Sequence, residues 1–255
     1  MRILFLGNNW VGWKILEWLN QEGEQVIGLI LNPPEKQNYG NELIETSGLN
    51  EQNVFDGSNI NDPMIIQQIQ RLNPDIAISV YFGCVLSKDI INIFPAGVLN
   101  LHPALLPYNR GANPNIWSIV DGTPAGVTIH YIDEGIDTGD IVAQTRVDIE
   151  PVDTGKTLYR KLEQASVKIF IEHWSYFRSG KFDRINQEKN CGSIHNSRDV
   201  DFIDHIDIHK SYLAKDLINI LRARTFPPFP GAYFLHEGKK IYLRLELLYE
   251  DELNG

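Results

Sequence analysis

The first hundred residues alternate short apolar runs with segments whose apolar residues recur at helical spacing. The runs are rich in β-branched residues, which predicts buried strands at residues 3–6, 25–31, 76–81 and 97–102. The intervening spacing predicts helices at residues 12–22 and 86–93 and a third helix that begins at Asn61-Asp62-Pro63, where an N-cap candidate precedes a proline. Strands that alternate with helices in this way predict a mostly parallel sheet covered by helices, with ligands outside the carboxyl ends of the strands.

The pattern changes in the second half of the chain. Two strand-like runs, 126–132 and 141–149, are joined by an acidic, glycine-bearing segment. Asp153 is then expected to cap a long helix whose apolar stripe is Leu158, Leu162, Ala165 and Ile169. A polar segment follows, and we place a domain boundary inside it. The predicted fold is therefore an α/β, Rossmann-like catalytic domain at residues 1–183 and a small C-terminal α+β subdomain at residues 184–255.

Composition excludes several classes of protein. Of the 255 residues, 43% are hydrophobic, 22% charged and 10% aromatic, which are ordinary globular values and argue against disorder, collagen and coiled coils. The apolar runs are too short to span a bilayer, and the N-terminal run is too short for the core of a signal peptide. We expect a cytoplasmic protein that does not act at a membrane.

Charge and cysteine content narrow the cofactors and partners. A net charge of −10 argues against nucleic acid as a partner, and Cys84 and Cys191 form no CxxC pair. Gly155-Lys156-Thr157 does not end a phosphate-binding loop, because Glu150 stands where that loop needs glycine. The segment 133–140 lacks the glycine position of a calcium loop, so we expect no metal.

The candidate chemistry lies at the end of the strand at residues 97–102. Side chains alternate across a strand, so Asn100 and His102 face the same side, and they bring an amide donor and a titratable imidazole together. Such a pair is often structural, but the proline- and glycine-bounded loop that follows, with Arg110, favours a site. The loop 7–12 lacks GxGxxG, and its backbone N–H groups indicate either an anion site or a plain tight turn.

Two longer segments resemble a known family. The run LNLHPALLPYNRG at residues 99–111 and GVTIHYIDEGIDTGDI at residues 126–141 resemble the folate-dependent formyltransferases, in particular those that act on nucleotide-linked sugars. Residues 222–232 are similar to the start of the C-terminal module of that family. Ala104 stands where a serine is common, and Tyr108-Asn109 replaces a more basic pair of the transfer-RNA enzymes. These departures bear on the acceptor rather than on the chemistry.

The resemblance implies transfer of a formyl group from 10-formyltetrahydrofolate, as a donor cosubstrate, to an amine. Asn100 is then expected to donate to the oxyanion of the tetrahedral intermediate, and His102 to donate or accept a proton. Asp137 is expected to orient His102 and to relay the amine proton, directly or through water. Carried over by position, the pterin would be bound by Phe82, Gly83, Cys84, Val85, Leu86, Val98, Asp133, Glu134 and Ile136.

Charge decides between the acceptors that the family formylates. Residues 186–255 hold nine lysines or arginines against eleven aspartates or glutamates, which does not suit the phosphates of a transfer RNA. A dTDP- or GDP-linked 4-amino-4,6-dideoxysugar is the expected acceptor. Its sugar and diphosphate would contact Asn8, Asn9, Trp10, Tyr81, Tyr108, Arg110 and Gly111, and its base could stack on Phe226, Phe229 or Tyr233.

Three alternatives stay open at this point. One is an enzyme that formylates another amine, such as methionyl-transfer RNA. Another is a non-catalytic module that binds folate or a nucleotide, against which the three intact site residues argue. A Rossmann oxidoreductase is weakened by the missing GxGxxG. The sequence allows a homodimer without requiring one.

Overall fold

The computed structural model describes residues 1–180, 182–188 and 191–254. The chain forms two compact units, and each is built from three segments. Unit 1 comprises Met1–His102, Val127–Thr145 and Glu163–Lys189. Unit 2 comprises Pro103–Gly126, Arg146–Leu162 and Asn190–Gly255. The predicted division between residues 183 and 184 stays a prediction.

Within the described residues, unit 1 is built on a seven-stranded sheet in the order β3-β2-β1-β4-β5-β7-β8. The neighbours from β3 to β5 pair in parallel, whereas β5 and β7 are antiparallel. The strands are β1 (Arg2–Gly7), β2 (Gln25–Leu31), β3 (Val54–Asp56), β4 (Ile76–Val80), β5 (Val98–His102), β7 (Ala125–Tyr131) and β8 (Ile141–Val147). The predicted mostly parallel sheet is confirmed.

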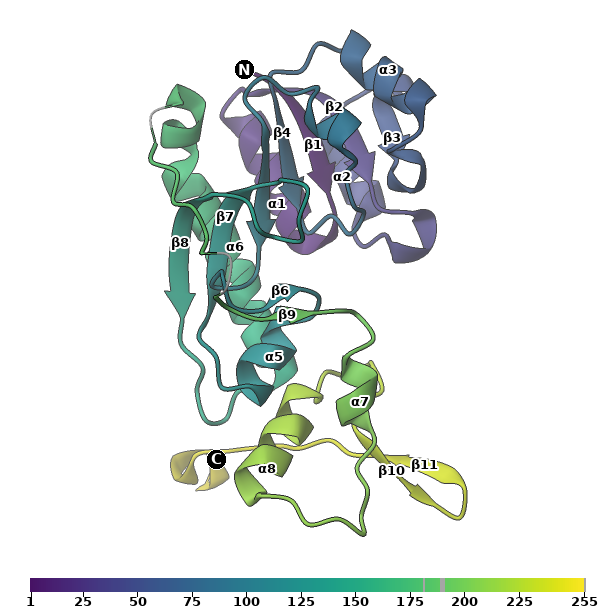
Figure 1. Cartoon of the computed structure of the whole chain (residues 1–255), viewed down its shortest axis with the longest axis vertical. Helices are drawn as coiled ribbons and strands as arrows, with labels where there is room; N and C mark the ends of the chain where they lie inside the picture. The colour runs from purple at the N-terminus through teal and green to yellow at the C-terminus, as the bar shows by residue number, and fades with distance from the viewer. Residues whose placement is uncertain (181, 189–190, 255) are drawn as a thin grey trace. The chain divides into compact units, whose positions relative to one another are not determined.

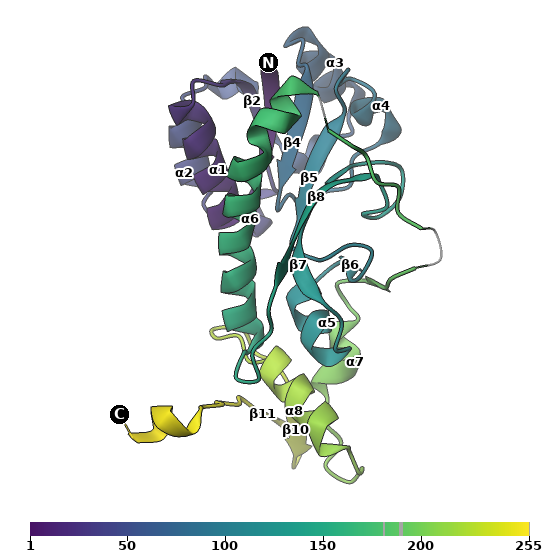
Figure 2. The ribbon, with the colours of Figure 1, turned by 90° about the vertical axis from the view of Figure 1, so that its left-hand side faces the viewer.

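Helices cover both faces of this sheet (Figure 2), as helices must where strands are apolar on both sides. The helix α1 buries Val11, Ile15, Leu16 and Leu19, which recur at the spacing of one helical face. The helices of unit 1 are α1 (Asn9–Gln21), α2 (Gly40–Ser47), α3 (Pro63–Arg71), α4 (Lys88–Ile91) and the later part of α6 (Gly155–Ser179), with 3-10 turns η1 (Pro34–Lys36), η2 (Glu51–Asn53) and η3 (Gly57–Asn59).

Local signals identified some helix starts and missed others. The predicted cap of α3 is confirmed, because the Asp62 carboxylate accepts a hydrogen bond from Met64 N at 2.7 Å. The predicted cap of α6 is wrong. Thr154 and Thr157 exchange hydroxyl and backbone N–H bonds at the start of α6, while Asp153 accepts from Glu150 N, Thr157 Oγ1 and Lys161 Nζ.

Two other predicted elements are longer in the sequence pattern than in the structure. The helix expected at 86–93 is reduced to α4, and the strand expected to reach residue 149 ends at Val147. The apolar residues flanking α4, Leu86 and Phe94, are buried although they lie outside the helix. An apolar run in this part of the chain therefore reflects packing of loops against the core.

Unit 2 holds short elements (Figure 1): β6 (Arg110–Gly111), α5 (Pro114–Val120), the first turns of α6, β9 (Ile194–His195), α7 (Val200–Asp204), α8 (Ala214–Ala223), β10 (Tyr233–His236), β11 (Lys239–Tyr242) and η4 (Glu250–Asn254). The strand β6 pairs with β9, and β10 with β11. Glu237 and Gly238 join β10 to β11 with φ of 49° and 77°, as a tight hairpin turn requires. The predicted small C-terminal α+β subdomain is confirmed as a fold class. No helix in the described ranges is long and apolar enough to cross a membrane.

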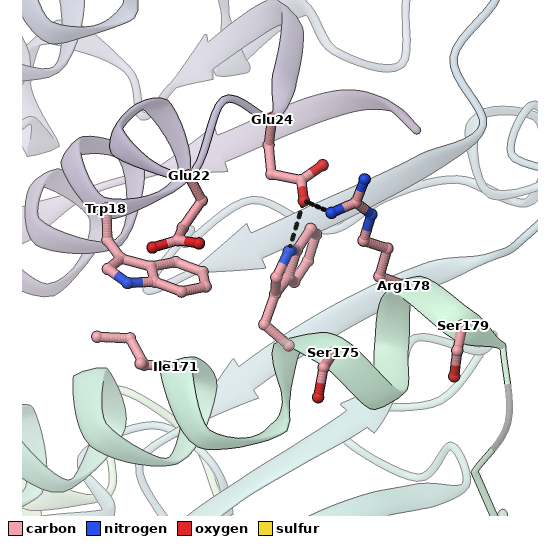
Figure 3. A pocket seen from close by; sticks show the side chains of 8 residues that line it. Trp18, Glu22, Glu24, Ile171, Ser175, Arg178 and Ser179 are labelled. Carbon is pink, nitrogen blue, oxygen red and sulfur yellow. Dashed lines mark hydrogen bonds and ion pairs between the residues drawn. The ribbon is translucent and has the colours of Figure 1, made fainter.

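A cavity of about 480 Å³ lies between α1 and α6 in unit 1 (Figure 3). Glu24 is buried there, and its Oε1 accepts from Trp174 Nε1 at 2.9 Å and pairs with Arg178 Nη1 at 3.2 Å. These two donors offset the cost of burying the carboxylate. The interactions tie the residue that precedes β2 to the last turns of α6.

Candidate active site

The sheet order reverses at the carboxyl ends of β1 and β4. The chain leaves β1 toward β2 and β3 on one side and returns to β4 on the other, and open α/β sheets bind ligands at such a reversal. Asn8 and the first turn of α1 follow β1, and the segment 81–87 follows β4. A hydrogen bond from Asn8 N to Val80 O at 3.1 Å joins Asn8 to the end of β4. Four residues predicted to contact the acceptor lie here: Asn8 is the N-cap of α1, Asn9 and Trp10 begin that helix, and Tyr81 directly follows β4.

The polar groups of the segment 7–12 are largely engaged within the protein. Asn8 N and Asn9 N donate to backbone carbonyls, Val11 N donates to Asn9 Oδ1 at 2.7 Å, and Gly12 N donates to Asn8 O. Asn9 Nδ2 also donates to Glu163 Oε1 at 3.0 Å. The segment therefore has fewer N–H groups for an anion than the sequence suggested, which favours the tight-turn interpretation.

Asn100 and His102 lie on the same side of β5. The strand pairs with β7, where Asn100 is opposite His130 and His102 is opposite Thr128. Asn100 Nδ2 lies 3.1 Å from His130 Nε2, and His130 Nδ1 lies 2.8 Å from Tyr131 O. A carbonyl only accepts, so His130 carries a proton on Nδ1, and a neutral ring then accepts from Asn100 on Nε2. This contact orients the Asn100 amide.

Asp137 faces both histidines. Its Oδ2 lies 3.6 Å from His102 Nδ1, and its Oδ1 lies 3.5 Å from His130 Nε2. Both imidazoles are buried, and the carboxylate is only partly exposed. Both separations exceed a direct hydrogen bond, and either would become an ion pair only with a protonated imidazole. The structure thus brings Asn100, His102 and Asp137 together in unit 1, around a histidine that was not predicted.

A left-handed turn and hydrogen bonds from Gln187 hold the backbone at Asp137 in place. Asp137 has a φ of 51°, in the left-handed region, and Gln187 Nε2 donates to Asp137 O at 2.9 Å and to Gly139 O at 2.7 Å. Gly139 is required, since a Cβ there would lie 2.0 Å from Tyr131 O. Gln187 itself is buried. The backbone of Asp137 is therefore held by a turn and by a glutamine fifty residues later in the chain.

Sequence reasoning missed His130 and Gln187. His130 lies within the segment 126–141 that carried the family resemblance, and its alternation with Thr128 across a strand could have indicated it. Gln187 gave no signal, because it lies in a polar segment that reads as a loop. Its function depends on a contact that local pattern does not encode.

The predicted pterin wall at 82–86 has a fixed backbone. Gly83 N donates to Asn32 Oδ1 at 2.9 Å, and Asn61 both donates to Val85 O at 2.9 Å and accepts from Ser87 N at 2.8 Å. Val85 is 80% exposed, whereas Leu86 and Val98 are buried. Burial raises the pKa of the Cys84 thiol, an effect that Lys36 partly offsets and that Asp56 and Glu35 add to.

The second predicted wall is an acidic turn. Asp133 Oδ1 accepts from Gly135 N at 3.0 Å and from Thr138 Oγ1 at 2.6 Å, so this carboxylate builds the turn itself. Ile136 is 50% exposed, and Glu134 Oε1 lies 2.5 Å from Lys88 Nζ. The turn therefore presents an apolar side chain next to an ion pair.

Tyr108, Arg110 and Gly111, the remaining predicted acceptor contacts, belong to unit 2. Tyr108 is exposed, while Arg110 is buried and its Nη1 donates to Cys191 O at 3.3 Å. Gly111 has a φ of 84°, and a Cβ there would lie 2.3 Å from His195 O. Arg110 is thus tied to the segment 191–195 rather than held out in solvent.

The comparison with protein families decides the class of the protein. The family described as formyl transferase matches residues 1–173, about two thirds of the chain. The chain belongs to the formyltransferase family. A second family, described as the N-formyltransferase dimerization C-terminal domain, matches residues 199–249. The protein is an enzyme of formyl transfer, and the family resemblance drawn from its sequence is confirmed.

Individual relatives agree with this assignment. The methionyl-tRNA formyltransferase of Agathobacter rectalis is 30% identical over 249 residues, 94% of this chain and 77% of that protein. A 4-N formyltransferase from Francisella tularensis is 25% identical, with a TM-score of 0.79 over 97% of this chain and 98% of that one. A formyltransferase from Anoxybacillus kamchatkensis, in complex with UDP-4,6-dideoxy-4-formamido-L-AltNAc and tetrahydrofolate, is 31% identical, with a TM-score of 0.59 over 79% of this chain and 89% of that one.

The chemistry of formyl transfer explains why a formyltransferase would hold such groups. Attack of an amine on a formyl carbon places negative charge on oxygen and positive charge on nitrogen. The first charge needs a hydrogen-bond donor, and the second needs a group that removes a proton. An amide, two imidazoles and a carboxylate in one partly buried cluster can supply both.

Proposed function

We propose that this formyltransferase transfers the formyl group of 10-formyltetrahydrofolate to the amino group of a nucleotide-linked amino sugar. The observation that carries the proposal is the cluster of Asn100, His102 and Asp137, with 3.6 Å between His102 Nδ1 and Asp137 Oδ2. The tetrahydrofolate bound to the Anoxybacillus relative supports a folate donor.

Each member of the cluster has a proposed step. The acceptor amine forms a bond to the formyl carbon, and Asn100 Nδ2–H stabilises the oxyanion of the tetrahedral intermediate. The amine proton passes to His102 or to Asp137, directly or through water. The bond from the formyl carbon to N10 then breaks, and N10 takes up a proton, which releases tetrahydrofolate and the formamide. His130 is a positioning residue that orients Asn100 and faces Asp137.

The proposed donor site lies between the two segments with fixed backbones. The pterin would contact residues 82–86, Val98 and the turn from Asp133 to Ile136. Exposed Val85 and Ile136 offer apolar surface to a planar ligand, and the hydrogen bonds of Asn32 and Asn61 keep the first segment in place. The proposed acceptor contacts are Asn8, Asn9, Trp10, Tyr81, Tyr108, Arg110 and Gly111.

Two observations favour a nucleotide-linked sugar as the acceptor. The Francisella relative is described as a 4-N formyltransferase, and the Anoxybacillus relative binds a UDP-linked 4-formamido sugar. The C-terminal seventy residues also hold more acidic than basic residues, which disfavours the phosphates of a transfer RNA. The methionyl-tRNA formyltransferases among the relatives make transfer RNA the competing acceptor.

Matched assays separate the acceptors. The enzyme is given 10-formyltetrahydrofolate with thymidine-, guanosine- and uridine-linked amino sugars, or with charged methionyl-transfer RNA, at one salt concentration. We expect an amino sugar to be formylated much faster than the transfer RNA. Turnover should be absent when the donor is left out, and a metal chelator should not reduce the activity. Comparable rates on both acceptors would make methionyl-transfer RNA the favoured acceptor.

A thermal-shift comparison tests the other classes. A ligand that binds the native state raises the melting temperature, so reduced folate should stabilise this protein and a nicotinamide dinucleotide should not. Stabilisation by folate without turnover on any amine would indicate a non-catalytic binding module. Stabilisation by the dinucleotide alone would indicate an oxidoreductase.

We also propose that the protein forms a homodimer through residues 199–249. This part of unit 2 matches the dimerization family and exposes large apolar side chains, among them Phe202, Leu213 and Phe229. Light scattering after size-exclusion chromatography should give twice the mass of one chain. A monomer at micromolar concentration would contradict the proposal.

A further inference from the structure

One ion pair joins the two segments proposed as walls of the donor site. Lys88, the first residue of α4, follows the segment 82–86, and its Nζ lies 2.5 Å from Glu134 Oε1 in the opposite turn. Both side chains are about two-thirds exposed, at 67% and 70%. The ammonium therefore lies in solvent, between the two walls.

The walls do not need this ion pair to stay in place. Asn61 holds the first segment through Val85 O and Ser87 N, and Asp133 builds the second through Gly135 N and Thr138 Oγ1. An exposed ion pair adds little to stability, because water solvates both partners well when they separate. Lys88 can therefore exchange Glu134 for another carboxylate at little cost.

The residues around Lys88 and Glu134 indicate the kind of molecule whose carboxylate could replace Glu134. An exposed apolar side chain lies close in sequence to each partner, Val85 three residues before Lys88 and Ile136 two residues after Glu134. A ligand with a flat, partly apolar body and an anionic end matches this combination. Folate has that form, since its glutamate tail carries one further carboxylate for each glutamate added.

Charge around the site makes a cation necessary for such a tail. The turn from Asp133 to Asp140 is acidic, and the chain carries a net charge of −10, so neither the turn nor the net charge attracts a polyanion. The hydrogen bond and the charge of Glu134 raise the pKa of Lys88, so the ammonium stays protonated at neutral pH. Lys36 is a second cation on this side, but its electrostatic effect falls on Cys84, in the first wall.

We propose that Lys88 receives the carboxylates of the glutamate tail of the donor, and that Glu134 holds the ammonium until the donor binds. The enzyme would then select folates that carry several glutamates. This inference rests on the proposed function, because it takes the segments 82–86 and 133–136 as the walls of the donor site.

The test measures binding of 5-formyltetrahydrofolate, a stable relative of the donor, with one or three glutamates by titration calorimetry. We expect the triglutamate to bind about fivefold more tightly at low ionic strength, the effect of one exposed ion pair. Added salt should reduce this ratio. In Lys88→Ala the ratio should fall to one, and in Lys88→Arg it should persist. Lys168→Ala is the matched control, since Lys168 forms an exposed pair with Glu172 on α6.

Several outcomes would overturn the inference. A wild-type ratio in Lys88→Ala, with both folates still bound, would refute the role of Lys88 and leave the proposed function intact. Loss of the ratio in Lys36→Ala but not in Lys88→Ala would place the tail on the other side of the site. Failure of the wild type to bind either folate would refute both the inference and the proposed donor.

Discussion

A polar cluster around Asn109 in unit 2 and the cluster around Asn100 in unit 1 differ in how closely their atoms approach. In unit 2, Asn109 Nδ2 donates to Ser118 Oγ at 2.9 Å and to Thr123 Oγ1 at 2.8 Å, and its Oδ1 accepts from Ser193 Oγ at 3.0 Å. In unit 1, Asn100 is 3.1 Å from His130, but Asp137 stays 3.5 Å or more from either imidazole.

This difference distinguishes a cluster with a structural role from one suited to catalysis. Asn109 is fully buried and neutral, and its short hydrogen bonds satisfy the amide within the protein. Asp137 is a partly exposed carboxylate near two titratable rings at distances that a bound substrate can shorten. The replacement at Tyr108-Asn109, interpreted from sequence as bearing on the acceptor, therefore has a structural explanation at Asn109.

The largest effect is expected from the Asn100 cluster. His102→Ala and Asp137→Asn should each lower kcat by roughly a thousandfold, because each removes a group that acts on charge in the transition state. Asn100→Ala should cost roughly a hundredfold to a thousandfold. Steady-state kinetics with the amino sugar, together with its binding affinity, checks this.

The double variant sharpens that result. If His102 and Asp137 move one proton as a unit, His102→Ala combined with Asp137→Asn should be little slower than either change alone. Acceptor affinity should stay near that of the wild type. Independent, multiplying losses in folded protein would show that Asp137 serves only to close the turn from Asp133 to Gly139.

The opposite behaviour is expected from the other cluster. Asn109→Ala removes the side-chain amide that bonds to the hydroxyls of Ser118, Thr123 and Ser193, and it should lower the free energy of unfolding by about 2–4 kcal/mol. Ser193→Ala removes the bond from Ser193 Oγ to Asn109 Oδ1 and the bond from Asn109 N to Ser193 Oγ, but leaves the two bonds of Asn109 Nδ2, and it should cost less. Urea unfolding measures both. A stable Asn109→Ala protein with much reduced kcat would reverse the comparison.

His130 is expected to have an intermediate effect. Its removal frees the Asn100 amide to move, and a displaced catalytic group costs at most roughly a hundredfold in rate. We expect His130→Ala to lower kcat and to change its pH profile. His173→Ala is the matched control, because His173 also places Nδ1 near a backbone carbonyl, Ile169 O at 3.0 Å, but lies on α6. Equal losses in both variants would indicate a general packing defect.

The sequence predicts features that depend on neighbours along the chain. Strands β1, β2, β4 and β5 follow from apolar runs, and the cap of α3 from Asp62 and Pro63. The same alternation along β5 places Asn100 and His102 on one face. These features need only the period of a strand or the first turn of a helix.

Specific side-chain contacts, most of them between residues far apart in the chain, account for what the sequence does not predict. The antiparallel pairing that puts His130 opposite Asn100 joins residues thirty positions apart. The bonds from Gln187 to Asp137 O and Gly139 O span about fifty positions. Asp153 looks like a helix cap in sequence, but Lys161 and Thr157 occupy its carboxylate in the folded chain. None of these partners leaves a periodic pattern.

The smallest effect concerns the two cysteines, one in each unit. Cys191 is exposed, whereas burial raises the pKa of Cys84 and keeps its thiol protonated at neutral pH. Only the thiolate reacts with iodoacetamide, so Cys191 should be alkylated several times faster than Cys84 at pH 7.5. The rate at Cys84 should keep rising with pH until the pH passes the raised pKa.

Bound folate extends this measurement to the proposed donor site. Cys84 lies in the segment 82–86, so a folate bound there should slow the alkylation of Cys84 further. The alkylation of Cys191, whose carbonyl accepts from Arg110, should not change. Peptide mass spectrometry resolves the two sites. Equal rates at both cysteines would show that Cys84 is more accessible than its burial indicates. Unchanged labelling of Cys84 with saturating folate would remove it from the pterin wall and restrict the donor to the turn at 133–136 and Val98.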